Sequence, residues 1–413
     1  MQQWARFAIL GAMFVTAYLL ILAWQKDYGH AAPAPQQQAA AVTAHEVSAD
    51  LPNAQNATAA SDLPQANVTA SQTTEHNTSV SQQLISVQTD LYHLWINPKG
   101  GDIVRIELLS HDESKDSDKP FVMLESDAKR TYVAQSGLIG LNGPDSSRGG
   151  RPMYDVEKTA YTLADAKSVA SKDGKTHQVL TVPLVFKTPE GVEVIKSFTF
   201  TQGDYPITVK HQVVNRSQQN WQGQMFGQLK RDNSDDPGKS SQGIFTLGTY
   251  LGGAWGTPEE HYNKLKFANF NDEKLNVEAK GGWVAMVQHY FVSAWIPGNL
   301  KLTQADGQPY TAKLESRQSA DGMNIMGFTS PVINVPAGTS MEVDAQLYSG
   351  PKIQSELKDL AAGLNQTVDY GWLWPIAKLL FLGLQFFHNL VGNWGWSIIL
   401  LTILVKLILW PLS

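Results

Sequence analysis

The stretch Val192-Glu-Val-Ile-Lys-Ser-Phe-Thr-Phe200 decides the class of fold, because its apolar and polar residues partly alternate. A period of two is typical of a β-strand that buries one face. No long amphipathic helix interrupts 84–350, so the sequence predicts one large, mainly β domain there, most simply a β-sandwich. Further runs rich in β-branched and aromatic residues, bounded by turn residues, are 84–89, 91–96, 103–109, 179–186, 207–214, 283–288, 290–296 and 341–347.

The composition narrows the class of protein. The chain has 413 residues, 43% of them hydrophobic and 17% charged, with a net charge of −6 and no cysteine. This apolar content is too high for a disordered protein. The lack of cysteine excludes disulfides, Cys-ligated zinc, iron–sulfur clusters and a cysteine nucleophile. The mildly acidic balance argues against a broad basic surface, so no nucleic-acid partner is expected.

The β region carries no common catalytic signature. The patterns GxGxxG, HExxH and GxSxG are absent. Asp236-Pro-Gly-Lys-Ser240 ends like a phosphate loop, but Asn233 stands where that loop needs its first glycine. The acid–histidine group Glu259-Glu260-His261 follows Pro258, which favours a solvated turn, and 250–256 suits packing at a sandwich corner better than a sugar or peptide groove. We therefore expect no enzyme activity, no cofactor and no metal site.

The first apolar block predicts an N-terminal membrane anchor. Residues 7–24 carry no charge, and a helix over them would be about 27 Å long, close to the hydrocarbon thickness of a bilayer. Arg6 before the block predicts a cytoplasmic N-terminus. A cleaved signal peptide is the alternative, but its apolar core has only about 7–15 residues and ends at small residues. This block ends at Trp24-Gln-Lys26. We expect an anchor over 1–28.

Two linking segments flank the β region. Residues 29–83 consist mostly of Ala, Pro, Gln, Thr, Ser and Asn, which bury too little apolar surface to offset the entropy of ordering. They predict a disordered tether outside the cytoplasm. A helical connector is expected over 351–371, because Ile353, Leu357, Leu360 and Leu364 recur at helical spacing.

The segment 372–391 predicts an amphipathic helix. Pro375 falls in its first turn, where a helix tolerates proline. At 100° per residue, Lys378, Gln385 and Asn389 share one narrow face with His388 beside them, and the rest is apolar. This pattern is typical of a helix in the membrane interface, with a helix of the soluble core as the alternative. The candidate interface residues are Trp372, Trp374, Lys378, Phe381, Phe386, Trp394 and Trp396.

The last block, 392–413, predicts a second membrane span. Its apolar run from Trp394 to Leu412 would form a helix of about 28 Å with tryptophans near both ends. Lys406 is the charged residue inside it, and its ammonium costs about 2.5–3.5 kcal/mol at the centre of a bilayer. Either its stem snorkels to the headgroups, or it faces a wet cavity with Thr402 on the same face. The expected fold class is a mainly β soluble domain with α-helical transmembrane segments at both ends.

Several strings in a fixed order resemble one protein family. They cover nearly the whole chain except the tether, and they resemble the YidC-type membrane protein insertases of Gram-negative bacteria. Two strings belong to the helical end, DYGWLW (369–374) and VGNWGWSI (391–398). The strings of the periplasmic domain are LISVQTD (84–90), QSGLIG (135–140), GGRPMYDVEK (149–158), GQLK (227–230) and KGGWVAMVQHYFVSAWIP (280–297).

The resemblance implies a fold, a location and partners. It implies a large β-supersandwich like the galactose-mutarotase-like sugar-binding folds. It implies a multi-pass protein of the bacterial inner membrane with 29–391 in the periplasm. The implied function is insertion and folding of inner-membrane proteins, alone or with the Sec translocon. The implied partners are nascent membrane proteins, the Sec translocon with its accessory subunits, and the lipid bilayer.

The resemblance also gives Lys406 a role. The family carries a basic residue, usually arginine, in a hydrophilic groove open to the cytoplasm and the lipid, and Lys406 stands in that place with Thr402 as a helper. Lysine keeps the charge but lacks the bidentate fork of arginine. The family has four further core helices beyond the end of this chain at Ser413, so we expect a fragment that is inactive by itself.

Two other functions stay open at this point. One is a membrane-anchored sugar-binding or mutarotase-like β-domain, which would need an acid–base pair such as His261 or His289 near a carboxylate. The other is a domain that serves only as a docking surface for translocon subunits.

Overall fold

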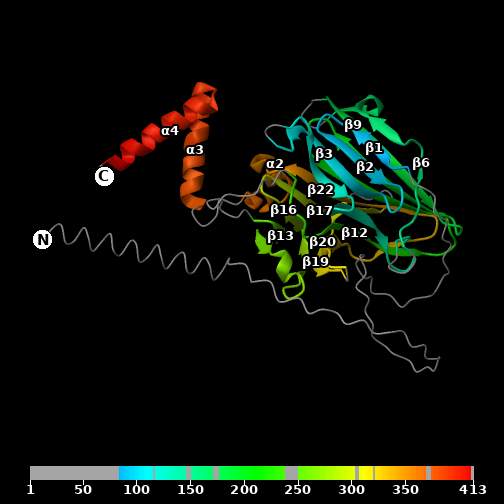
Figure 1. The fold of residues 1–413 in the computed structure, drawn as a ribbon. Coiled ribbons are helices and arrows are strands. Elements are labelled where there is room, and N and C mark those ends of the chain that lie inside the picture. Colours follow the sequence, from blue (N-terminus) through cyan, green and yellow to red (C-terminus); the bar gives the residue numbers. More distant parts are fainter. Residues whose placement is uncertain are drawn as a thin grey trace, which may run out of the picture. The chain divides into compact units, whose positions relative to one another are not determined.

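The computed structural model describes residues 83–114, 117–145, 150–170, 176–237, 250–302, 307–319, 321–368 and 374–410. The predicted anchor and nearly all of the predicted tether lie outside these residues. The chain divides into two compact units, Met1–Ala57 and Thr58–Ser413, and every described residue belongs to the second unit. Figure 1 shows its strands followed by helices at the C-terminal end.

The first sheet has eleven strands, and every described pairing in it except β1 with β7 is antiparallel. It brings together strands from both ends of the β region, because β12 lies between β5 and β20. In sheet order its strands are β15 (Asn276–Lys280), β19 (Thr311–Gln318), β20 (Asn324–Thr329), β12 (Trp221–Arg231), β5 (Thr131–Ile139), β4 (Pro120–Ser126), β3 (Asp102–Asp112), β2 (Tyr92–Asn97), β1 (Ile85–Gln88) and β7 (Ala160–Thr162), with β21 (Ile333–Val335) beside β12.

The second sheet also has eleven strands, and its described pairings are antiparallel. The stretch 192–200 lies in β10, between β9 and β11. In sheet order the strands are β14 (Asn263–Leu265), β13 (Gly252–Gly256), β16 (Trp283–Val287), β17 (Phe291–Leu302), β22 (Ser340–Pro351), β11 (Pro206–Asn215), β10 (Val192–Thr201), β9 (Thr176–Lys187) and β6 (Asp155–Val156), with β18 (Gln308–Pro309) beside β17 and β8 (Lys167–Ala170) beside β9.

Both sheets contribute to one hydrophobic core. Val194 and Phe198 of β10 are buried in the same cluster as Leu94 of β2 and Trp295 of β17. The hydroxyl of Tyr92 in β2 donates a hydrogen bond to the carbonyl oxygens of Tyr205 and Ser349, each 2.7 Å away. The predicted β class is confirmed. The segment 250–256 contains the largely buried strand β13, which pairs with β14 and β16 near the end of the second sheet.

A charged quartet, Asp102, Asp145, Arg151 and Lys196, interrupts this apolar interior. Lys196 takes an inward position of β10 and is fully buried. Its Nζ donates to the carbonyl oxygens of Gly100 (2.9 Å) and Ser136 (2.7 Å). Arg151 donates to the same two oxygens and pairs with both carboxylates of the quartet. The quartet therefore joins β10 of the second sheet to strands of the first.

The connector is part of the β-domain rather than a free linker. Leu357 and Leu364 are fully buried, and the indole Nε1 of Trp283 donates to the carbonyl of Ala362 at 2.9 Å. Within the described residues, no helix has both the length and the apolarity needed to cross a bilayer. The helices and 3-10 turns are η1 (Leu163–Asp165), η2 (Phe267–Asn269), α2 (Gln354–Leu360), η3 (Leu364–Thr367), α3 (Trp374–Val391) and α4 (Trp394–Leu409).

Candidate functional site

The helices α3 and α4 form a hairpin joined by Gly392 and Asn393 (Figure 1). Gly392 has a φ of +66° and its N–H donates to the carbonyl of His388 at 2.7 Å, which is a left-handed cap that ends α3. Asn393 begins α4, because its Oδ1 accepts hydrogen bonds from the N–H groups of Gly395 (2.8 Å) and Trp396 (3.3 Å). The string VGNWGWSI (391–398), one of those that resemble the insertase family, therefore encodes this turn.

Side chains also hold the two helices together. The rings of His388 and Trp394 stack across the turn, with centroids 3.8 Å apart and planes 6° apart. Farther along, Gly383 faces Leu401 so closely that a Cβ at position 383 would lie 3.0 Å from Leu401 Cδ1. The sequence grouped His388 with the polar stripe of α3, but in the structure its ring is half-buried against Trp394, whereas Gln385 and Asn389 are exposed.

Much of the hairpin surface is apolar and exposed. A continuous surface of this kind marks contact with a membrane or a partner. Its apolar side chains are Ile376, Leu379, Leu380, Leu382, Phe386, Leu390, Val391, Trp394, Trp396, Ile398, Ile399, Ile403, Leu404, Leu407, Ile408, Leu409 and Trp410.

Lys406 and Thr402 lie on α4 as neighbours four residues apart, and both are exposed. The Thr402 hydroxyl donates to the carbonyl of Ile398 at 2.7 Å, so its proton is engaged within the helix and its oxygen can still accept. The structure thus presents one ammonium and one hydroxyl oxygen among the exposed side chains of α4, whose other hydroxyl, on Ser397, is buried.

The predicted interface residues are described to different extents. Trp372 lies outside the described residues, and the structure describes the backbone of Trp374 and Lys378 in α3 but not their side chains. Phe381 is half-buried. The remaining three are exposed: Phe386 (66%), Trp394 (49%) and Trp396 (63%).

The two histidines proposed for a sugar site, His261 and His289, have different surroundings. His261 lies in an exposed turn closed by the Thr257 N–H donating to the Glu260 carbonyl at 2.9 Å. His289 stacks on Tyr290 at 3.9 Å. Neither imidazole takes part in an ion pair among the described residues, which also contain no cluster of metal-ligating side chains.

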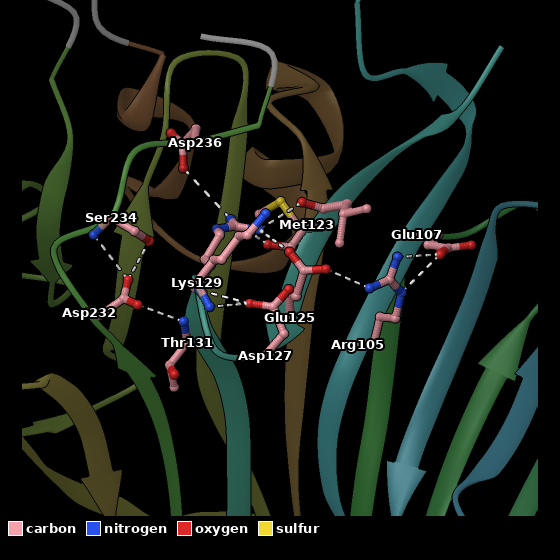
Figure 2. A network of polar contacts seen from close by, with 12 residues as sticks. Arg105, Glu107, Met123, Glu125, Asp127, Lys129, Thr131, Asp232, Ser234 and Asp236 are labelled. Atoms are coloured by element: carbon pink, nitrogen blue, oxygen red, sulfur yellow. Dashed lines mark hydrogen bonds and ion pairs between the residues drawn. The ribbon is translucent and has the colours of Figure 1, made fainter. Parts of the chain in front are cut away.

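A polar network at one end of the sandwich was not predicted from the sequence (Figure 2). Arg105 pairs with Glu107 and Glu125 at 2.9 and 2.6 Å. Asp236, from the loop-like string, accepts a hydrogen bond from Arg231 Nη2 at 2.7 Å. Burial, and then the neighbouring Arg231, lowers the pKa of Arg130. Asp236 therefore neutralises buried arginine. The Lys-Ser end of the loop-like string, 239–240, lies outside the described residues.

The match to a protein family decides the identity of the chain. The family model described as the YidC periplasmic domain matches residues 84–382, which include the whole β-domain, the connector and the first part of α3. The chain belongs to the YidC family. The resemblance seen in the sequence strings is thereby confirmed.

Curated relatives extend this match over nearly the whole chain. The membrane protein insertase YidC of Pseudomonas putida is 42% identical over 409 residues, and that of Stutzerimonas stutzeri is 44% identical over 409 residues. Each alignment covers 99% of this chain and 69% of the relative. A galactose mutarotase related enzyme from Lactobacillus acidophilus is 10% identical with a TM-score of 0.39, over 64% of this chain and 97% of that one. A likeness this distant says nothing about activity.

Besides the polar network, two features of this YidC-family chain were missed by sequence reasoning. The quartet around Lys196 joins residues far apart in the chain. The one sign of it in the sequence is that Lys196 occupies a position of 192–200 that the alternation reserves for an apolar, inward-facing residue. The His388–Trp394 stack joins residues only six apart, with an aromatic pair flanking a Gly-Asn turn as its signal.

Proposed function

We propose that this YidC-family chain takes part in inserting and folding proteins of the bacterial inner membrane. The names of its relatives, membrane protein insertase, support the insertion part of this proposal. Nascent membrane proteins are the proposed clients, and the Sec translocon is a proposed partner. The observation that carries the proposal is the exposed apolar hairpin with one ammonium, Lys406, on its second helix.

The proposed arrangement in the membrane follows from the two apolar blocks. Residues 1–28 anchor the chain, 29–83 tether it and 84–371 lie in the periplasm. The helix α3 lies in the outer interface, and 392–413 enters the bilayer. With 16 residues α4 is about 24 Å long, less than the roughly 30 Å of an average hydrocarbon core. Local thinning of the bilayer around a short helix would accommodate the difference at modest cost.

Lys406 supplies the proposed chemistry without forming a bond. A client must move a short polar tail through an apolar layer, and a fixed positive charge in a wet groove stabilises that tail, especially an acidic one, along the way. The apolar segment of the client then enters the lipid, and burial of about 20 apolar residues drives the step. The Thr402 oxygen can accept a hydrogen bond from the client backbone. No nucleotide or cofactor is required.

The sugar-binding alternative gains little support from the described residues. Neither His261 nor His289 forms an ion pair among them, and Asp236 acts on the pKa of His289 only electrostatically, more weakly than burial does. The translocon-docking role of the β-domain is compatible with insertion and does not compete with it.

A chimera tests the proposal. Residues 1–413 replace the matching stretch of the Pseudomonas putida insertase, and the insertion of a client with an acidic tail is measured by protease protection of the tail. We expect Lys406→Arg to be at least as active as the parent, Lys406→Ala to be several-fold slower and Lys406→Glu to be slowest. Ile408→Ala, on the opposite side of α4, should change little. Equal insertion by the three Lys406 variants would show that the lysine only snorkels.

A further inference from the structure

We propose that the turn between α3 and α4 is a rigid positioning element that sets the depth of Lys406 in the membrane. This element, here called the elbow, consists of His388, Gly392, Asn393 and Trp394. The inference rests on the proposed function, since it assumes that α3 lies in the interface and that α4 enters the bilayer.

The backbone of the elbow allows few alternatives. The backbone of Gly392 is in the left-handed region, which residues other than glycine, asparagine and aspartate rarely adopt. Nothing lies within 4 Å of a Cβ built at Gly392, so glycine is needed there for its conformation and not for space. A β-branched residue at this φ would force the turn to change, whereas asparagine would keep it.

Asn393 determines where α4 begins. Its side chain accepts from the N–H groups of Gly395 and Trp396, and its carbonyl accepts from the Ser397 hydroxyl at 2.6 Å. Ser397 is fully buried. The two bonds to the Asn393 side chain satisfy two N–H groups of the first turn of α4, which have no partner within the helix.

Two separate contacts then fix the direction of α4 relative to α3. The His388–Trp394 stack lies at the turn, and the Gly383–Leu401 contact lies nine residues away from Gly392 on either helix. Two contacts at different heights prevent the hairpin from opening, which one contact would not do. The helices therefore behave as one rigid unit.

Because the angle between the two helices is fixed, the position of α3 in the interface determines how deep the Lys406 ammonium lies in the membrane. Lys406 lies twelve residues beyond Trp394, which is about 18 Å along α4. Its depth is this length times the sine of the angle between α4 and the interface. A change of that angle from about 60° to about 40° raises the charge by about 4 Å. Because the energy of a buried charge depends steeply on depth, the elbow positions Lys406 for its client.

Depth can be measured on the 413-residue chain in lipid nanodiscs. The chain has no cysteine, so Leu407→Cys provides a single site for a nitroxide label next to Lys406. Power saturation with oxygen and a nickel chelate gives the depth of the label. The test variants are Gly392→Val, Asn393→Ala and Gly383→Leu. The matched conservative variants are Gly392→Asn and Asn393→Asp, which keep the left-handed turn and the cap.

We expect the two conservative variants to keep the parental depth. The three test variants should shift the label by about 3 Å or more, roughly the rise of two helical residues, and should slow insertion in the chimera several-fold. An unchanged label depth in Gly392→Val and Asn393→Ala would overturn the inference, whatever their insertion rates. Should Gly392→Val fail to accumulate, Gly383→Leu decides in the same way, because it leaves the turn itself intact.

The two proposals fail separately. If the test variants shift the label while Lys406→Ala and Lys406→Glu insert clients normally, the elbow still sets the depth and the role of Lys406 in insertion is wrong. If the label does not move while the Lys406 variants fall in the expected order, the proposed function stands and the elbow does not position the lysine.

Discussion

Lys196 shows how one residue changes the interior of the β-domain. It takes an inward position of β10, where the other inward side chains are apolar. Its Nζ donates hydrogen bonds to the carbonyl oxygens of Ser136 in β5 and of Gly100 in the turn between β2 and β3. Burial lowers its pKa to about 7, while Asp102 and Arg151 act on it in opposite directions. The other charged or titratable groups that face it are Asp145 and His211.

The lowered pKa of Lys196 predicts that the domain becomes more stable as the pH rises. Between pH 7 and about 10.5 the folded state has released this proton and the unfolded state still binds it. The free energy of unfolding should therefore rise by about 1–2 kcal/mol between pH 7.5 and 9. Urea unfolding of the detergent-solubilised chain, followed by circular dichroism, measures this change.

Lys196→Met is the matched control for the pH dependence, because methionine fills a similar volume without a charge. The variant should lose the rise in stability above pH 7 that belongs to Lys196. Parallel pH dependences of the parent and the variant would show that Lys196 keeps its proton in the folded state over this range.

Tyr92 makes a second prediction at the scale of one residue. Its hydroxyl bridges the two sheets through the carbonyls of Tyr205 and Ser349. Tyr92→Phe removes one buried donor and should lower the free energy of unfolding by about 1–2 kcal/mol. Tyr290→Phe alters a tyrosine that is 68% exposed and should change stability by less than about 0.5 kcal/mol. Equal effects of the two changes in urea unfolding would contradict the bridging role of Tyr92.

At the scale of elements, local pattern predicted the strands and helices well. The alternation in 192–200 falls within β10, and each of the short apolar runs overlaps a strand and extends past it by at most one residue at either end. The period of a sequence can locate a strand because it depends on neighbouring residues alone. Strand order could not be read in this way. The pairing of β12 with both β5 and β20 joins segments about ninety residues apart, and no local signal encodes it.

In the candidate site, too, local pattern located the helices but did not show how they contact each other. The sequence indicated a break at 392–395 and a charge at Lys406, and α3 and α4 meet at that break. The stacking of His388 on Trp394 was missed, because helical periodicity places His388 on the polar stripe and says nothing about the next helix. The roles of Lys406 and Thr402 remain predictions until tested.

The connector and the hairpin are held by different kinds of contact. The connector is fastened to the β-domain by the buried Leu357 and Leu364 and by the hydrogen bond from Trp283 to Ala362. The hairpin is fastened internally by the elbow and the Gly383–Leu401 contact. Each is therefore a unit whose internal geometry can be tested by single substitutions.

At the scale of the whole molecule, the chain combines a polar-surfaced β-domain with an apolar hairpin. The periplasmic-domain match ends within α3, and the alignments with the Pseudomonas putida and Stutzerimonas stutzeri insertases continue over 99% of the chain. Family membership accounts for both parts in one protein. Within the proposal, the β-domain stays in the periplasm while the hairpin brings one positive charge into the bilayer.

The most direct test of this account asks whether position 406 faces water. In the chimera with the Pseudomonas putida insertase, freed of native cysteines, Lys406→Cys and Ile408→Cys are each treated with a membrane-impermeant thiol reagent in inverted membrane vesicles. Position 408 lies 200° around α4 from 406 and serves as the lipid-facing control. We predict that the cysteine at 406 is labelled and the cysteine at 408 is not. Protection of both positions would place the ammonium in lipid and contradict the proposed role of Lys406.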